Sequence, residues 1–166
     1  VRSFNEHHQA LGVKHIVFLD NGSTDQTLEL ARTFERVTIL QTRRPYRKYE
    51  TVMKWYLVRR FSKGRWNLLV DIDELFDYPF SETLDVGALL RYLNTNSYTA
   101  VLAQMLDLFS DIPLGDLTSA PSDSLKERYP YYDVSNIEKR AYRHGTPANA
   151  EIKTHFGGVR KSIFGT

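Results

Sequence analysis

The spacing of apolar residues predicts alternating helices and strands over the first hundred positions. Apolar residues three and four positions apart indicate helices, and short apolar runs bounded by turn residues indicate strands. The expected helices cover 4–11, 23–34, 49–61 and 84–93, and the expected strands cover 13–19, 37–40, 68–70 and 98–105. The order strand, turn, helix, strand over 13–40 predicts a β-α-β unit. The fold class that we expect is therefore α/β with a parallel sheet.

A dense turn signal links the first expected strand to the helix that follows it. The residues are Asp20-Asn21-Gly22-Ser23-Thr24-Asp25, which are types that favour turns. Ser23 and Gln26 have the spacing of a capping box, so the helix is expected to begin at Ser23. Because β-α-β crossovers are right-handed, we expect this turn at the carboxyl edge of the sheet.

A second acidic cluster follows the apolar run 68–70. Asp71, Asp73 and Glu74 lie within four residues. Unpaired carboxylates are costly inside a sheet, so these acids are expected at the carboxyl end of a buried strand, with Asp71 and Asp73 on one side of it. Open α/β sheets bind their ligands at that edge, and oxygen ligands suit Mg²⁺ or Mn²⁺ together with substrate phosphates. An isolated D-x-D pattern is more often a solvated turn.

Two further polar groups have both a functional and a structural interpretation. The loop 42–48 carries four basic residues, among them Arg43. A guanidinium group at the ligand edge would suit phosphate, and a solvated surface loop explains these residues equally well. His7 and His8 are adjacent, so they do not share a helix face and make a poor metal pair. We expect both histidines to be packing or surface residues.

Composition narrows the class of protein and the kinds of partner. A length of 166 residues predicts a single domain, 1–166. The 22 basic and 20 acidic residues nearly cancel, which gives no reason to expect a nucleic-acid partner. The absence of cysteine excludes disulfides and thiolate metal sites, and no apolar run is long enough to span a membrane. From 110 to 149 prolines and tyrosines replace the regular pattern, as in a functional lid.

Several common motifs are missing from the sequence. There is no Walker A pattern, no G-x-G-x-x-G after an expected strand, and no G-x-S-x-G. The remaining chemistry is an acid-rich edge beside basic and aromatic residues. Such an edge fits a ligand that carries a diphosphate and a base or sugar.

The order of these motifs resembles family 2-like glycosyltransferases with the GT-A fold. The segments that carry the resemblance are 7–13, 20–25, 71–74, 106–109, 131–133 and 157–161. The resemblance implies a GT-A, Rossmann-like sheet with helices on both faces. In that fold 1–109 would bind the nucleotide sugar and 110–166 would form the acceptor side. Almost no room precedes Phe4 for the first strand of the fold, so this strand is expected to be missing or truncated.

The resemblance also implies roles at the matching positions. Asp20 and Asn21 would lie near the nucleotide base, and Asp25 would support their loop. Asp73 would be the direct ligand of Mn²⁺ or Mg²⁺. Asp71 would lie close to the ribose or to metal-bound water.

Assignments outside these motifs stay open. Asp107 and Asp133 are candidates for the base that deprotonates the acceptor hydroxyl, with Asp111 as a rival. Each of these acids alone is more often the cap of a turn. His155 is a candidate metal ligand, although a lone histidine is more often structural. Arg160 is a candidate for contacting the diphosphate.

These expectations describe a metal-dependent transfer of sugar from a nucleoside-diphosphate sugar to an acceptor hydroxyl, with inversion. The acceptor would be a glycan, a lipid or a protein. Two alternatives remain: a metal-dependent phosphohydrolase or nucleotidyltransferase, and a non-catalytic nucleotide-sugar-binding module. The expected location is the cytoplasm or the cytoplasmic face of a membrane, with no membrane segment in the chain and no nucleic-acid partner.

Overall fold

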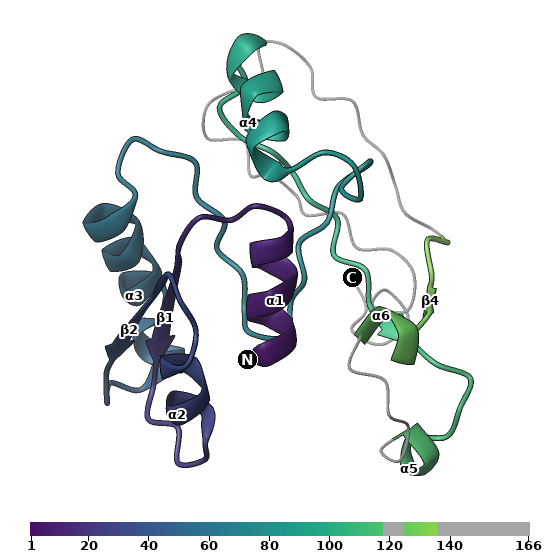
Figure 1. Cartoon of the computed structure of the whole chain (residues 1–166). Coiled ribbons are helices and arrows are strands. Elements are labelled where there is room, and N and C mark those ends of the chain that lie inside the picture. Colours follow the sequence, from purple (N-terminus) through teal and green to yellow (C-terminus); the bar gives the residue numbers. More distant parts are fainter. Residues whose placement is uncertain (118–124, 136–166) are drawn as a thin grey trace. The chain divides into compact units, whose positions relative to one another are not determined.

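A computed structural model of the chain describes residues 1–117 and 125–135. The chain divides into two compact units, Val1–Thr99 and Ala100–Thr166, and each is described by itself. The first unit contains helices α1 (Arg2–Ala10), α2 (Thr27–Arg32), α3 (Tyr46–Phe61) and α4 (Val86–Thr95) and strands β1 (Ile16–Asp20) and β2 (Val37–Gln41) (Figure 1). The expectation of a mixed α/β chain is confirmed.

The two strands of the first unit form a small parallel sheet. Their register runs from Ile16 opposite Val37 to Asp20 opposite Gln41. The amide of Thr42 donates to the carbonyl of Asp20 at 2.9 Å, which extends the pairing beyond both strands. With α2 between the strands, the predicted β-α-β unit is confirmed. Asp20 and Gln41 therefore end the two strands side by side, at the carboxyl edge.

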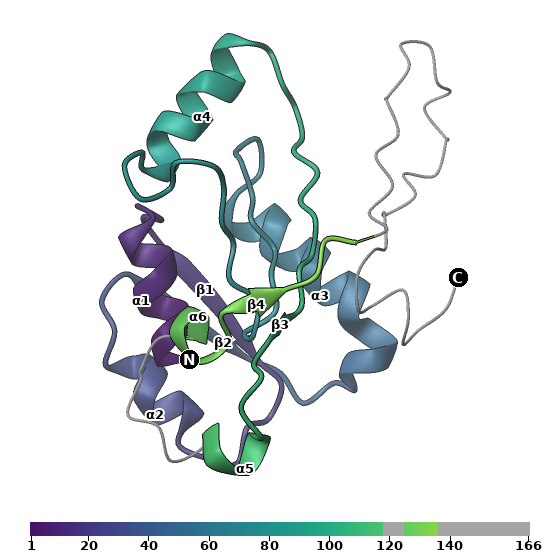
Figure 2. The ribbon, with the colours of Figure 1, turned by 90° about the vertical axis from the view of Figure 1, so that its right-hand side faces the viewer.

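Helix α1 packs on β1 through aromatic residues. The ring centroids of Phe4 and Phe18 lie 5.8 Å apart, and Phe4 and Leu11 are buried. In both views the strand pair lies between α1 and α3 (Figures 1 and 2). The helix ends where predicted, since Gly12 follows it with a φ of +92° that favours glycine.

The adjacent histidines of α1 both contact the backbone of Phe76. His8 is 2% exposed, its Nε2 accepts from the amide of Phe76 at 3.4 Å, and its Nδ1 is 2.8 Å from the carbonyl of Phe4. His7 donates from Nε2 to the carbonyl of Phe76 at 2.6 Å. The prediction that these residues serve packing is confirmed. In addition, both side chains form hydrogen bonds with the backbone of Phe76. They tie α1 to the segment that follows the D-x-D acids.

The expected strand over 68–70 is not formed. This segment is irregular, and Leu68 and Leu69 are 43% and 49% exposed. A strand needs a neighbour for its backbone groups, and this three-residue apolar run has none in the described sheets. Directly after it the backbone closes a turn, in which the amide of Glu74 donates to the carbonyl of Asp71 at 3.0 Å. The prediction of a buried strand with acids at its end is therefore wrong.

The expected strand over 98–105 is also absent, and these residues are irregular and mostly exposed. The described part of the second unit contains short elements instead. They are β3 (Leu108–Phe109), α5 (Leu114–Leu117), α6 (Leu125–Arg128) and β4 (Tyr131–Tyr132). Strands β3 and β4 pair in antiparallel fashion, with Leu108 opposite Tyr132. Sequence pattern did not predict this pair, because it depends on a partner more than 20 residues away.

The four helices of the first unit begin at other residues than expected, and α1 begins two residues earlier. Helix α2 begins at Thr27, and its N-cap Gln26 makes no side-chain capping bond, so the predicted capping box of Ser23 and Gln26 is wrong. Helix α4 begins at Val86, where Asp85 caps it by accepting from the amide of Ala88 at 2.7 Å. Helix α3 confirms the predicted helix and begins three residues earlier.

Candidate functional site

Asp20 organises the turn at the carboxyl end of β1. Its side chain is almost wholly buried and accepts hydrogen bonds from the amides of Gly22 at 3.2 Å and Ser23 at 3.0 Å. The side-chain Nε2 of Gln41, from the neighbouring strand, donates to it at 3.3 Å. Hydrogen bonding from the Ser23 side chain, helped by these other donors, holds the pKa of Asp20 below its usual value, although burial acts in the opposite direction. The carboxylate is therefore charged and committed to the turn.

The other polar members of this turn also stabilise local structure. Asn21 donates from Nδ2 to the carbonyl of Arg44 at 2.6 Å, which links the turn to the loop after β2. Asp25 accepts from the amide of Thr27 at 3.0 Å and so caps the start of α2. Hydrogen bonding to the Thr27 side chain, then to its amide, lowers the pKa of Asp25. Asp25 thus performs the capping that was predicted for Ser23.

A hollow lies beside this turn. Its volume is 480 Å³. The residues that line it are Asp20, Gly22, Ser23, Thr24, Gln41, Thr42 and Arg43. They come from the carboxyl ends of β1 and β2 and the loops that follow, which is where open α/β sheets bind ligands. The lining combines the Asp20 carboxylate, hydroxyl groups, a carboxamide and one guanidinium group, of which the hydroxyl and guanidinium groups suit a phosphorylated polar ligand.

Gly22 lines this hollow in a conformation that favours glycine. Its φ is +95°, and no atom lies within 4 Å of the position that a Cβ would take. Thr42, directly after β2, accepts at Oγ1 from the amide of Arg44 at 3.2 Å. Arg43, which lies between Thr42 and Arg44 in the sequence, is exposed. The lining of the hollow thus includes one cationic side chain.

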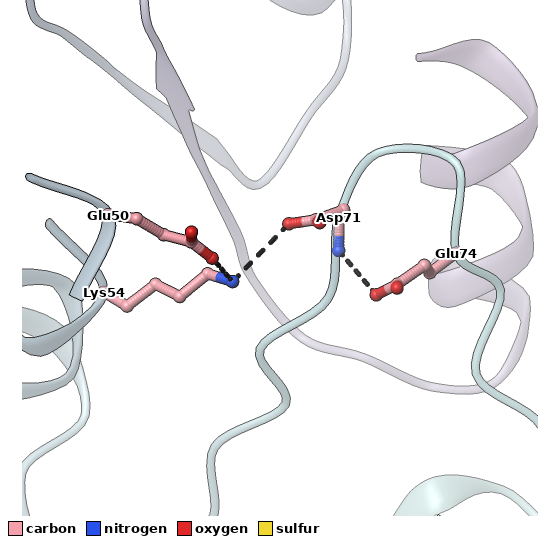
Figure 3. A network of polar contacts seen from close by, with 4 residues as sticks. All are labelled: Glu50, Lys54, Asp71 and Glu74. Carbon is pink, nitrogen blue, oxygen red and sulfur yellow. Dashed lines mark hydrogen bonds and ion pairs between the residues drawn. The ribbon is translucent and has the colours of Figure 1, made fainter. Parts of the chain in front are cut away.

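The D-x-D acids form a separate, exposed turn (Figure 3). The amide of Asp71 donates to Glu74 Oε2 at 2.8 Å, and Asp71 Oδ1 lies 3.7 Å from Lys54 Nζ of α3. Lys54 also donates to Glu50 Oε1 at 2.7 Å, and this bond, more than the charge of Asp71, raises the pKa of Lys54. The solvated-turn alternative thus describes the local conformation here.

Asp71 and Asp73 do not line the hollow beside Asp20. The expectation that both acidic clusters meet in one crevice depended on a strand over 68–70, and that strand is not formed. In the described residues, no three histidine or acidic side chains come close enough to hold a metal together. Mg²⁺ and Mn²⁺ are commonly held by one or two carboxylates with water and substrate phosphates. The exposed Asp71 and Asp73 fit an ion of this kind only as part of a shared site with a phosphate ligand.

The candidate catalytic acids Asp107 and Asp133 lie at the same end of the β3–β4 pair. Asp107 precedes Leu108 and Asp133 follows Tyr132, and Leu108 and Tyr132 are opposite each other. Asp133 accepts from the amide of Ser135 at 2.8 Å, so it caps a turn. Hydrogen bonding to the Ser135 side chain and amide lowers the pKa of Asp133. A carboxylate with a lowered pKa is a weaker base.

His155 and Arg160 lie outside the residues that the structure describes. Sequence reasoning, in turn, missed Glu50, Lys54 and Gln41. The four-residue spacing of Glu50 and Lys54 is a recognisable helix pair. Nothing in the sequence indicates that Lys54 also faces Asp71.

None of the helices within 1–117 and 125–135 is long and apolar enough to cross a lipid bilayer. Comparison of the chain with protein-family models, with curated proteins and with solved structures returns no match.

Proposed function

We propose that this chain binds a nucleoside-diphosphate sugar and transfers the sugar to an acceptor hydroxyl with the help of Mn²⁺ or Mg²⁺. The fold in this proposal is a GT-A, Rossmann-like sheet that includes the β-α-β unit. The observation that carries the proposal is the 480 Å³ hollow at the carboxyl ends of two parallel strands. The turn that lines it is the D-N-G-S-T-D segment, one of the six segments that carry the resemblance.

Each group of the first unit has a distinct role in this proposal. Asp20 holds the turn in shape by accepting from the amides of Gly22 and Ser23, so that the turn lines the hollow in which the ligand would lie. Arg43 contributes positive charge for the diphosphate, since guanidinium groups bind phosphate oxygens in pairs. Asp71 and Asp73 hold the divalent ion together with that diphosphate. A bound ion of this kind would neutralise charge on the leaving nucleoside diphosphate.

The acceptor step needs a base. A carboxylate that takes the proton of the acceptor hydroxyl gives a direct displacement, which inverts the sugar carbon. Asp107 and Asp133 are the two candidates for this base.

Thermal unfolding with nucleotides tests the proposal. UDP and GDP should each be added with and without Mn²⁺. A nucleotide at a hundred times its dissociation constant should add about 3 kcal/mol to the free energy of unfolding and raise Tm by roughly 5–10 °C, because only the native state binds it. Asp73→Asn should lose the Mn²⁺-dependent part of the rise, because an amide is a weaker ligand than a carboxylate.

The matched control for Asp73→Asn is Glu82→Gln, which neutralises another exposed acid of the same unit. The control should respond like the unchanged chain. If no nucleoside diphosphate raises Tm in the presence of Mn²⁺, the proposal is wrong.

One observation favours a second candidate, a non-catalytic nucleotide-sugar-binding module. The hollow is lined without Asp71 or Asp73, so binding there would not need the D-x-D acids. Under this candidate UDP or GDP raises Tm equally with and without Mn²⁺, and Asp73→Asn has no effect. The same thermal experiment therefore separates the two functions.

A further inference from the structure

Helix α3 has one face packed within the first unit and one exposed apolar face. Met53 on the packed face is buried. On the other face three side chains are exposed, Val52 by 64%, Trp55 by 59% and Tyr56 by 54%. Because residues three and four positions apart share one side of a helix, these three side chains form one surface, the apolar face of α3.

Positive charge lies on both sides of this apolar face along the chain. Residues 43–65 contain nine basic residues and one acidic residue, Glu50, whereas the whole chain has a net charge of +2. Glu50 is already paired with Lys54 at 2.7 Å. The other eight basic side chains are exposed, four before the apolar face and four after it: Arg43, Arg44, Arg47, Lys48, Arg59, Arg60, Lys63 and Arg65. Within the described part of the chain, the ion pairs involve none of these eight.

The cationic and apolar groups also meet within the helix. The guanidinium carbon of Arg59, one turn after Trp55, lies 5.6 Å from the centre of the Trp55 ring. Tryptophan and tyrosine rings favour the boundary between lipid headgroups and acyl chains. Lysine and arginine can lay their apolar stems along such a boundary while their charged ends reach the phosphates. The exposed side of α3 therefore has the chemistry of a lipid interface.

We infer that α3 docks this protein onto a membrane surface that contains anionic lipids. The helix has 16 residues, so it would lie along about 24 Å of that surface. The apolar face would enter the headgroup layer, and the basic residues at both ends would contact negatively charged headgroups. This inference goes beyond the proposed sugar transfer and does not rest on it.

Two other occupants of this face fit the observations less well. A second copy of α3 would bring two strongly basic segments together, and like charges repel. A nucleic acid would pair with the cations and could stack on Trp55 and Tyr56. Val52, the most exposed of the three, has neither a ring for stacking nor a hydrogen-bonding group, and it gains free energy only from apolar surroundings. The combination thus favours lipid.

Sedimentation of the full chain with vesicles tests the inference. The chain should bind vesicles of phosphatidylcholine with phosphatidylserine, and it should bind pure phosphatidylcholine far more weakly. Added salt should release it, because ions screen the attraction between exposed charges. Equal binding to both kinds of vesicle, or binding to neither, overturns the inference and leaves the proposed function standing.

Charge variants locate the attraction on α3. Lys48→Gln with Lys63→Gln should weaken vesicle binding roughly thirtyfold, because each basic side chain near an anionic surface contributes about fivefold. Lys14→Gln with Arg32→Gln is the matched control, since it removes two exposed basic residues that lie outside 43–65. The control should retain most of the affinity. An equal loss in both double variants would show that net charge alone is responsible, which overturns the inference.

Aromatic variants test the apolar face. Trp55→Ala should weaken vesicle binding roughly tenfold, because its ring would no longer leave water. Tyr92→Ala is the control, since Tyr92 is an aromatic residue of α4 that is 60% exposed, and it should have little effect. Equal vesicle binding by Trp55→Ala and the unchanged chain overturns the inference.

Fluorescence gives a second measurement at the same residue. The chain has two tryptophans, so Trp66→Phe leaves Trp55 as the single fluorophore, and its emission should shift to shorter wavelength when anionic vesicles are added. An unchanged emission in the presence of bound vesicles contradicts the inference. If Trp66→Phe does not fold, the sedimentation variants decide. Binding to duplex DNA but not to anionic vesicles would assign the face to nucleic acid and overturn the membrane inference.

Discussion

Asp20 shows how a single side chain can define the edge of a sheet. It belongs to β1, yet its carboxylate bonds to the turn after β1 and to Gln41 of β2. Buried carboxylates are tolerated where several donors satisfy them. Asp20, which the resemblance would place near the nucleotide base, therefore has a structural role here, and the proposed ligand would meet the groups that Asp20 positions.

Asp20→Ala should lower the free energy of unfolding by about 2 kcal/mol. The substitution leaves the amides of Gly22 and Ser23 without their acceptor, and hydrogen bonds to a charged group are worth about that much. Urea unfolding followed by circular dichroism measures the loss. Glu35→Ala, which removes an exposed acid of the same unit, is the control and should change stability little. A loss for Asp20→Ala no larger than that of the control would contradict the structural role.

At the scale of elements, local signals predicted the helices well and the strands unevenly. Helix α1 and the β-α-β unit followed from apolar spacing and turn residues that are close in sequence. The expected strands over 68–70 and 98–105 failed, because a strand also needs a partner and apolar residues alone do not supply one. The acids 71–74 instead satisfy their own backbone within a turn. For the site, the hollow beside Asp20 was predictable and the pairing of Asp71 with Lys54 was not.

The contact of α1 with Phe76 should make stability depend on pH. Burial lowers the pKa of His8 below 6.5, while its bond to the Phe4 carbonyl acts in the opposite direction. A group with a lowered pKa binds its proton more readily in the unfolded chain, so its contribution is complete above pH 6.5 and is lost as the pH falls below that value. Protonation would also remove the acceptor for the amide of Phe76.

Urea unfolding at a series of pH values from about 8 to about 5 measures this dependence, because histidine changes its charge within that range. His8→Phe removes the titrating group and retains an aromatic ring of similar size. The free energy of unfolding of this variant should fall less steeply below pH 6.5 than that of the unchanged chain. The same slope in both proteins would show that His8 is not responsible.

At the scale of the whole molecule, the proposed ligand groups belong to one unit. The hollow, the D-x-D turn and Lys54 all lie within Val1–Thr99, whereas the candidate bases Asp107 and Asp133 lie in the second unit. We expect that substitutions of Asp107 leave nucleotide binding unchanged and act only on transfer.

The most direct test of the account is a nuclear magnetic resonance titration of the ¹⁵N-labelled full chain with UDP and GDP. The account predicts that one of them shifts the amide signals of the residues that line the hollow, at 20–24 and 41–43. Added Mn²⁺ should then broaden the signals of 71–74 before those of other segments, because a paramagnetic ion acts on its nearest neighbours. Shifts confined to other segments, or no shifts with either nucleotide, would contradict the central claim that this edge of the sheet binds a nucleoside diphosphate.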